Sequence, residues 1–181
     1  GGTGGFGGMA IPLAKAMGLY VITNGNGRNA ERVLKLGADE FIDYRQTDYV
    51  KVLKDVDYVI DTLGGQETAK QFQILKQGGS LVSLKGMPNG DFAKRMQLPF
   101  FKKILFGLAS SRLDKMAAKH QQKYFFIFVH ADGKQLQQAA DIFEKQSLHP
   151  VVEQVYPFSE LNTALQKVAQ GHAKGKTVIT F

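Results

Sequence analysis

The sequence predicts a three-layer α/β fold, in which helices cover both faces of a doubly wound parallel sheet. Short runs of β-branched and aromatic residues alternate with amphipathic stretches, and glycines separate most of them. Strands and helices that alternate in this way are typical of βαβ units. In addition, Gly2, Gly4 and Gly7 stand in the order G-x-G-x-x-G, directly before an amphipathic stretch. Together these observations predict a dinucleotide-binding domain of the Rossmann type.

The first half of the chain supplies four of the expected strands. The chain begins inside the glycine motif, which normally follows a buried strand, so the first strand of the sheet is expected to be missing. A helix from 8 to 17 ends before Gly18. The elements expected next are a buried strand 19–23, a polar turn 24–29, a helix 30–36, a loop and strand within 38–44, a short helix 49–54, a strand 56–61, a helix 66–75 and a strand 80–84.

The alternation breaks between residues 86 and 122. One or two helices are expected over 100–119, where Phe101, Ile104, Leu105 and Leu108 predict a buried stripe opposite the lysines. The remaining elements expected are a strand 124–129, a helix 133–145, an extended segment 148–155, a helix 159–169 and a final strand 175–181.

The composition is that of an ordinary globular protein. Hydrophobic residues make up 44% of the 181 residues and charged residues 22%. No apolar run is long enough to cross a membrane and no signal peptide is evident, so no membrane partner is expected. The chain has no cysteine, which excludes disulfides and thiolate zinc sites and is consistent with a cytoplasmic protein. The four histidines, at 120, 130, 149 and 172, lack close-spaced metal-ligand partners, so no metal site is expected.

The positive charge is concentrated in one segment. Between Lys85 and Lys123 there are nine basic residues and only two acidic ones, Asp91 and Asp114, which accounts for the whole net charge of +7. Such a cluster raises the question of nucleic-acid binding. No recognised motif interleaves aromatic residues with these cations, so the favoured interpretation is a solvated helical face near an anionic ligand or partner, without nucleic acid.

The glycine turn and the second strand end predict the cofactor. The turn Gly2-Thr3-Gly4-Gly5-Phe6-Gly7 is expected to bind the cofactor, because backbone N–H groups of Gly4 to Gly7 at a helix N-terminus are suited to a pyrophosphate. Proteins that bind NAD usually place an acid at the end of the next strand, to hold the ribose hydroxyls. This chain has amides, glycine and an arginine there instead, which favour a 2′-phosphate and hence NADP(H). These residues are Asn24, Gly25, Asn26 and Arg28.

Several stretches resemble the medium-chain dehydrogenase/reductase superfamily, and its zinc-independent quinone oxidoreductase-like branch in particular. The resemblance covers the whole chain in family order. It is carried by Gly2-Thr3-Gly4-Gly5-Phe6-Gly7, Leu36-Gly37-Ala38-Asp39, Val56-Asp57-Tyr58-Val59-Ile60-Asp61-Thr62-Leu63-Gly64, and Gly171 followed by Gly175-Lys176-Thr177-Val178-Ile179.

The resemblance implies a domain organisation and further cofactor contacts. Residues 1–150 would form the dinucleotide-binding domain, and 151–181 a tail that returns to a catalytic domain absent from this sequence. Tyr44 would lie beside the adenosine phosphate, Thr62, Leu63 and Gly64 beside the ribose, and Leu84, Lys85 and Gly86 on the nicotinamide side. Lys176 would approach the phosphates. No residue is assigned a catalytic role, and Asp61, at a buried strand end, is expected to brace neighbouring backbone.

The implied activity is hydride transfer from NADP(H) to a quinone or an α,β-unsaturated carbonyl, with this chain alone inactive. Two alternatives remain open: a zinc-dependent alcohol dehydrogenase whose metal-binding half is absent, and a non-catalytic NADP(H)-binding sensor or scaffold. The resemblance also implies a homodimer through the strand Tyr124–Val129, because an exposed apolar edge strand seeks a partner.

Overall fold

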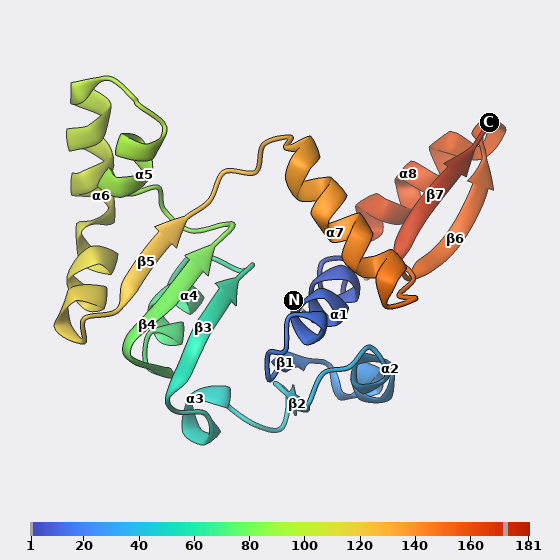
Figure 1. Ribbon diagram of the computed structural model, residues 1–181, viewed down its shortest axis with the longest axis horizontal. Helices are drawn as coiled ribbons and strands as arrows, with labels where there is room; N and C mark the ends of the chain where they lie inside the picture. The colour runs from blue at the N-terminus through green and yellow to red at the C-terminus, as the bar shows by residue number, and fades with distance from the viewer. Residues whose placement is uncertain (1, 172–173) are drawn as a thin grey trace. The chain divides into compact units, whose positions relative to one another are not determined.

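The computed structural model describes residues 2–171 and 174–181, and the chain divides into two compact units (Figure 1). Unit 1 combines the two ends of the chain, Gly1–Thr47 and Asp132–Phe181, whereas unit 2 is the continuous segment Asp48–Ala131. Every strand pair in the described residues is parallel, and helices flank the strands. The predicted α/β class with parallel sheets is therefore confirmed.

Unit 1 holds two pairs of parallel strands. β1 pairs with β2 and β6 pairs with β7. Its elements are α1 (Gly7–Ala16), β1 (Ile22–Gly25), the 3-10 helix η1 (Gly27–Asn29), α2 (Ala30–Lys35), β2 (Glu40–Asp43), α7 (Gly133–Lys145), β6 (Val152–Pro157), the 3-10 helix η2 (Phe158–Glu160), α8 (Leu161–Gln170) and β7 (Lys176–Thr180).

A small apolar core joins the first helices of unit 1 to its first strands. Ile11 of α1, Val33 of α2 and Ala38 are buried together, with Val21 and Phe41 packed against them. Val33 is fully buried because the apolar side of α2 faces α1 and β2. The glycine turn lies against β1, because Gly2 is next to Thr23 and Thr3 is next to Gly25.

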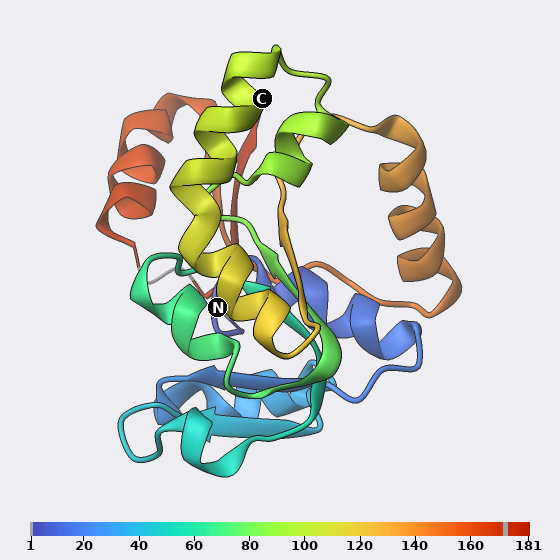
Figure 2. The same ribbon diagram turned by 90° about the vertical axis from the view of Figure 1, so that its left-hand side faces the viewer.

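Unit 2 is a three-stranded sheet in the order β3-β4-β5 with helices beside it (Figure 2). Its elements are α3 (Tyr49–Val52), β3 (Val56–Asp61), α4 (Gln66–Gln71), β4 (Leu75–Ser83), α5 (Gly90–Arg95), α6 (Phe100–Lys119) and β5 (Lys123–Phe126).

The core of unit 2 lies on one face of this sheet. Leu81 is fully buried at the centre of β4, between its register partners Val59 and Tyr124. α6 covers them with Leu113, Met116 and Ala117. Successive side chains of a strand point to opposite faces. Accordingly, Tyr58 and Ile60 of β3 point away from this core and are 67% and 55% exposed.

The strand predicted at 19–23 is shifted along the chain. The expected buried strand 19–23 begins only at Ile22, and Leu19 and Tyr20 are 41% and 65% exposed. Tyr20 keeps its ring at the surface, where its hydroxyl donates a hydrogen bond to Glu40 at 2.7 Å. β1 instead continues through Asn24 and Gly25, two residues predicted as turn, because they pair with β2.

The predicted buried stripe of the long helix is wrong. Phe101, Ile104, Leu105 and Leu108 are between 49% and 69% exposed. The helix is turned the other way, so that its buried face carries Phe106, Ser110, Leu113 and Ala117, whereas the four predicted residues face solvent.

The aromatic strand is shorter than predicted. β5 ends at Phe126, because its neighbour β4 ends at Ser83. Beyond the paired residues, one backbone hydrogen bond runs from the Ile127 N–H to the Ser83 carbonyl at 3.0 Å. Ile127, Phe128 and Val129 follow outside the strand and are 37%, 65% and 75% exposed.

We predict that Leu81→Ala lowers the free energy of unfolding by about 2–5 kcal/mol, since it leaves a cavity in the core of unit 2. Urea unfolding followed by circular dichroism measures the change. Leu105→Ala is the matched control, because Leu105 is 58% exposed in the same unit, and it should cost less than about 0.5 kcal/mol. Equal effects of the two substitutions would contradict the packing described here.

Candidate functional site

The glycine turn of unit 1 forms the start of α1. The Gly8 N–H donates to the Gly4 carbonyl at 3.1 Å, and the Ala10 N–H donates to the Phe6 carbonyl at 2.9 Å. A Cβ atom at Gly7 would clash with the backbone of Gly2, so the turn closes only with glycine at this position. The motif therefore has a structural requirement for glycine, and its backbone lies at a helix N-terminus as predicted.

Lys176 lies beside this turn. A Cβ atom placed on Gly5 would be 3.7 Å from Nζ of Lys176. Two residues predicted to contact cofactor phosphates, 171 positions apart in the sequence, are thus neighbours in unit 1.

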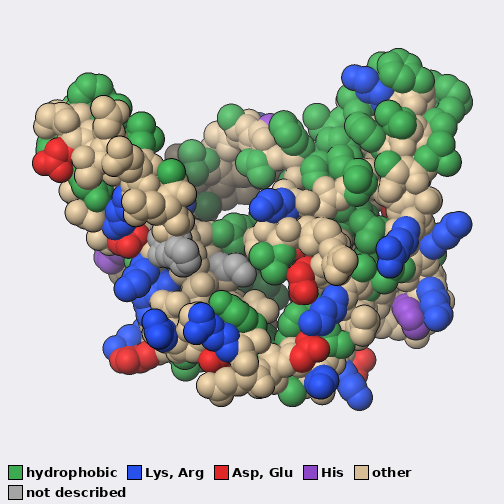
Figure 3. All heavy atoms as spheres, turned by 180° about the vertical axis from the view of Figure 1, so that it is seen from behind, with side chains coloured by type: hydrophobic (Ala, Val, Ile, Leu, Met, Phe, Trp, Pro, Cys, Tyr) green, Lys and Arg blue, Asp and Glu red, His purple; other side chains and the backbone are tan. Residues whose placement is uncertain are grey.

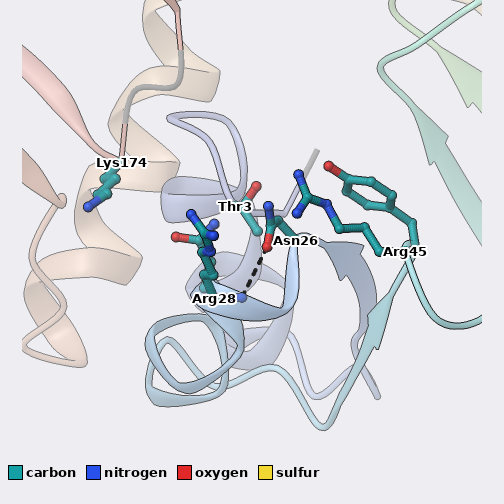
Figure 4. A pocket seen from close by; sticks show the side chains of 7 residues that line it. Thr3, Asn26, Arg28, Arg45 and Lys174 are labelled. Carbon is teal, nitrogen blue, oxygen red and sulfur yellow. Dashed lines mark hydrogen bonds between the residues drawn. The ribbon is translucent and has the colours of Figure 1, made fainter.

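A pocket of about 430 Å³ opens next to the turn, within unit 1 (Figure 4). Its volume is in the range of small-molecule sites. Four residues predicted from the sequence line it: Thr3, Asn26, Arg28 and Tyr44. Three further lining residues were not predicted, namely Asn29, Arg45 and Lys174.

The end of β1 positions the side chains of the pocket. The Tyr44 N–H donates to the Gly25 carbonyl at 3.2 Å, which fixes the start of the loop after β2. The Asn26 side chain caps η1 by accepting a hydrogen bond from the Arg28 N–H at 3.2 Å (Figure 4). Asn24 and Gly25, both predicted to bind the cofactor, lie in β1 and are not among the residues that line the pocket.

Arg32 joins two walls of the pocket. Its guanidinium donates to the Lys174 carbonyl at 2.7 Å and also to the Thr3 carbonyl. A planar guanidinium with several donors can hold two carbonyls at once, which lysine cannot do in the same geometry. Arg32 was not predicted from the sequence, because Lys174, whose carbonyl it holds near Thr3, lies at the other end of the chain.

The pocket is strongly positive. Arg28, Arg45 and Lys174 contribute three cations, and the lining found in the described part of the chain contains no carboxylate. The nearest acid at the strand ends is Asp43, whose side chain lies beside Gly27 and accepts the Arg45 N–H at 3.0 Å. The site is therefore suited to an anion that carries more than one negative charge.

In unit 2, one buried carboxylate organises the predicted cofactor loop after β3. Asp61 is fully buried. It accepts hydrogen bonds from the backbone N–H groups of Leu63 and Gly64 at 2.9 and 3.0 Å, and from the Thr68 hydroxyl at 2.6 Å. The expectation that Asp61 braces neighbouring backbone is thus confirmed.

The same carboxylate is linked to the loop after β4. The Ser83 hydroxyl donates to Asp61 at 2.7 Å and accepts the Gly86 N–H at 2.7 Å. The Leu84 N–H donates to the Asp61 carbonyl at 2.9 Å. The structure therefore brings the predicted residues Thr62, Leu63, Gly64, Leu84, Lys85 and Gly86 to one edge of the sheet in unit 2, as expected for neighbouring parallel strands.

The close approach of the two loops requires glycine at position 64. Gly64 has a φ of +75°, and an added Cβ would clash with the Lys85 carbonyl. The loop after β3 therefore passes directly over the loop after β4.

Hydrogen bonding decides the charge state of Asp61. Burial works against ionisation, but the bonds donated by Gly64, Thr68 and Ser83 outweigh it and hold the pKa of the Asp61 carboxyl below its usual value. Asp61 is therefore an ionised acceptor within the fold and not a proton donor at neutral pH.

A scan against protein-family models decides the family of the chain. The model described as zinc-binding dehydrogenase matches residues 36–179, which is most of the sequence. The chain belongs to the zinc-binding dehydrogenase family. This agrees with the resemblance to medium-chain dehydrogenases that the sequence motifs indicated.

The relatives of this chain include reductases. The NAD(P)H oxidoreductase RTN4IP1, mitochondrial, of Mus musculus is 33% identical, and the match covers 99% of this chain and 46% of the relative. The trans-enoyl reductase pgmF of Aspergillus terreus is 27% identical over 99% of this chain and 49% of its own length. The solved quinone oxidoreductase of Coxiella burnetii matches with a TM-score of 0.75 and 26% identity, over 99% of this chain and 50% of that one. The chain thus spans about half the length of these relatives.

The expectation of a cytoplasmic protein is overturned by these relatives. The RTN4IP1 oxidoreductases of Mus musculus, Danio rerio, Homo sapiens and Bos taurus are all named as mitochondrial. The error has a simple cause, because a cysteine-free composition distinguishes oxidising from reducing surroundings but does not distinguish one reducing compartment from another.

Neither a membrane span nor a metal cluster is found in the part of the chain that the structure describes. No described helix is both long and apolar enough to cross a membrane. No group of three or more His, Asp or Glu side chains is placed to hold a metal ion among the same residues. His172 lies outside the described residues.

We predict that Asp61→Asn flattens the loss of stability in acid. Because the pKa of Asp61 is lower in the folded than in the unfolded chain, its ionised form stabilises the fold fully above the unfolded pKa of about 3.9, and this contribution is lost as the pH falls through the folded pKa. The variant should be less stable at pH 7 by about 1–3 kcal/mol, with a smaller decline below about pH 5.

Urea unfolding at a series of pH values measures both effects. Asp91→Asn is the control, since Asp91 is exposed and pairs only with exposed Lys94 in unit 2. That variant should keep the acid sensitivity of the wild type. An unchanged pH dependence in Asp61→Asn would show that the network does not depend on ionisation.

Proposed function

We propose that this chain is the NADP(H)-binding portion of an oxidoreductase that transfers hydride to a quinone or to an α,β-unsaturated carbonyl. The observation that carries the proposal is the pocket of unit 1, where three cations and two asparagines gather next to a glycine turn. The relatives support the reaction class, since those compared above are named as an NAD(P)H oxidoreductase, a trans-enoyl reductase and a quinone oxidoreductase.

The residues of the pocket fit the 2′-phosphate that distinguishes NADP from NAD. Arginine pairs with phosphate through two parallel hydrogen bonds, and Arg28 and Arg45 both reach the pocket. Lys174 adds a third charge, and the Asn26 and Asn29 amides offer donors. A carboxylate in this lining would repel the phosphate, and the described lining has none. The ring of Tyr44 would lie against the adenosine.

Other residues would take the remaining parts of the cofactor. The backbone of the glycine turn, with Lys176 beside Gly5, would hold the pyrophosphate. In unit 2, the loops after β3 and β4 would contact the ribose and the nicotinamide side. Bound NADP(H) supplies the hydride, so the protein has to bind it, orient it and exclude water. Binding and orienting the cofactor depend more on a loop held by Asp61 than on a catalytic acid or base.

We also propose the domain organisation inferred from the sequence. Residues 1–150 would form the dinucleotide-binding domain, and 151–181 would return to a catalytic domain outside this sequence. Val155 and Phe158 support this assignment, because both are 53% exposed and are apolar.

The homodimer through residues Tyr124–Val129 remains part of the proposal. β5 is an edge strand of its sheet, and the apolar residues that follow it, Ile127 to Val129, are exposed. An edge of this kind pairs readily with a second copy. Light scattering at micromolar concentration tests it, and a monomeric mass would count against the dimer.

The zinc-dependent alternative is favoured by one observation, the description of the matching family as zinc-binding. It is separated from the main proposal by the metal content of the longer protein that contains this sequence. Stoichiometric zinc, together with loss of alcohol oxidation after chelation, would support the alternative. Turnover of quinones or enones that survives chelation would exclude it, and lack of turnover with any of these substrates would favour a non-catalytic sensor.

We predict that Arg28→Ala weakens NADPH binding by about 10- to 100-fold, because it removes hydrogen bonds between a guanidinium and the 2′-phosphate. NADH binding should be unchanged, since NADH lacks that phosphate. Arg45→Ala should behave in the same way. Calorimetric titration of the 181-residue chain with each cofactor measures the ratio.

Arg112→Ala provides a matched arginine control, since Arg112 lies on α6 in unit 2 and does not line the pocket. It should leave both affinities unaltered. An equal loss of NADPH and NADH binding in Arg28→Ala would remove the 2′-phosphate assignment.

A further inference from the structure

The long helix α6 presents one continuous stripe to solvent, which is apolar in its first half. Phe100, Phe101, Ile104, Leu105 and Leu108 are 76%, 64%, 49%, 58% and 69% exposed. Their spacing of three and four residues places them on one side of the helix. Figure 3 shows hydrophobic side chains gathered over the upper end of α6, at the upper right of that view.

The same side of α6 continues as a cationic stripe. Arg112, Lys115 and Lys119 follow Leu108 at helical spacing, and all three are exposed. Lys102 is exposed at one edge of the apolar half, whereas half-buried Lys103 precedes Phe106 by three residues and lies toward the packed side of the helix. Four exposed cations thus border or extend an apolar face on a single helix.

These cations are not neutralised within the described part of the chain. No ion pair joins Lys102, Lys103, Arg112, Lys115 or Lys119 to a described acidic side chain. The two acids of the basic segment are engaged elsewhere. Asp91 pairs with Lys94, and Asp114 accepts hydrogen bonds from Asn89 and Ser110. The positive charge on α6 is therefore available to an external anionic partner.

The opposite side of α6 is already fixed in the fold. Leu113, Met116 and Ala117 pack on the sheet of unit 2, and the ring of Phe106 lies 6.3 Å from that of Phe92. The exposed apolar stripe is consequently not a surface that rotation of α6 would bury. It is an exposed surface of a helix that is held in place by its packing on the sheet.

We infer that the exposed stripe of α6 binds the surface of an anionic membrane. Exposed aromatic and leucine side chains insert at the boundary between headgroups and acyl chains, and neighbouring lysines and arginines pair with anionic headgroups. Lys102 can reach the headgroups while its aliphatic stem stays on the apolar face. α6 lies on the bilayer in this arrangement and does not cross it. The proposal departs from the expectation of no membrane partner, and it is independent of the cofactor assignment.

Charge favours a membrane over the other possible occupants. The core of a protein interface is depleted in lysine, whereas here Lys102 borders the apolar stripe and three further cations extend it at one end. A second copy of α6 would place four exposed cations against four more. An anionic bilayer instead complements the apolar and the cationic parts of the stripe together.

The chain contains no tryptophan, so a single introduced one reports on the site directly. Phe101→Trp should show a blue-shifted emission with vesicles of phosphatidylcholine containing about 30% phosphatidylserine, and no shift with phosphatidylcholine alone. Leu136→Trp, at a position 73% exposed on α7, is the control and should show no shift with either.

Vesicle flotation of the 181-residue chain measures the contributions of charge and apolar area. Lys115→Glu with Lys119→Glu should weaken binding to the anionic vesicles at least about tenfold, as should Phe101→Ser with Leu108→Ser. The matched controls on α7 and α8, Lys134→Glu with Lys145→Glu and Leu136→Ser with Leu165→Ser, should bind like the wild type. Raising the salt concentration should release the wild type.

Three outcomes would overturn the proposal. They are equal binding to neutral and anionic vesicles, no emission shift in Phe101→Trp, and a fall in molar mass by light scattering when Leu108 is replaced. The last would identify a second copy as the occupant of the stripe. Circular dichroism of each variant ensures that lost binding is not lost folding, and the single-tryptophan variants keep the apolar stripe intact.

Discussion

The buried carboxylate of Asp61 is the interaction on which the geometry of unit 2 depends. An ionised group without solvent is costly unless each of its oxygens accepts hydrogen bonds, and here backbone N–H groups and two hydroxyls fill that requirement. The requirement works in both directions. The donors keep the carboxylate ionised, and the carboxylate dictates where two loops stand. Their shape therefore follows from electrostatics more than from apolar packing.

Unit 1 uses a cation in the corresponding way. Arg32 holds the carbonyls of Thr3 and Lys174, so that the glycine turn and the segment before β7 form neighbouring walls of one pocket. The other charged residues of the pocket are positive too, and the repulsion among these cations is unfavourable until an anion binds. Both units thus fix a surface with one multiply bonded ionic side chain, negative in unit 2 and positive in unit 1.

Local patterns predicted the fold and part of the site. Alternating apolar runs gave the parallel strands, and Arg28 and Tyr44 were found because both follow strands. Arg32 and Lys174 were missed, since their roles depend on which distant segments meet, and one sequence does not contain that information. Arg45 follows the same strand as Tyr44 and could have been found in the same way. The prediction of which face of α6 is buried was wrong for a related reason. Its two faces are both apolar in part, so periodicity alone did not decide which of them meets the sheet.

The division of the chain has a consequence for its synthesis on the ribosome. Unit 2 is continuous, so all of its residues have been made once Ala131 is added. Unit 1 needs residues from both ends of the chain, and the bond from Arg32 to Lys174 closes a loop of 142 residues. Domains generally fold as their residues become available, and closure of a long loop is slow. The cationic pocket is thus a late product of folding, completed only after Lys174 has left the ribosome, while the early-folding unit already exposes the apolar stripe of α6.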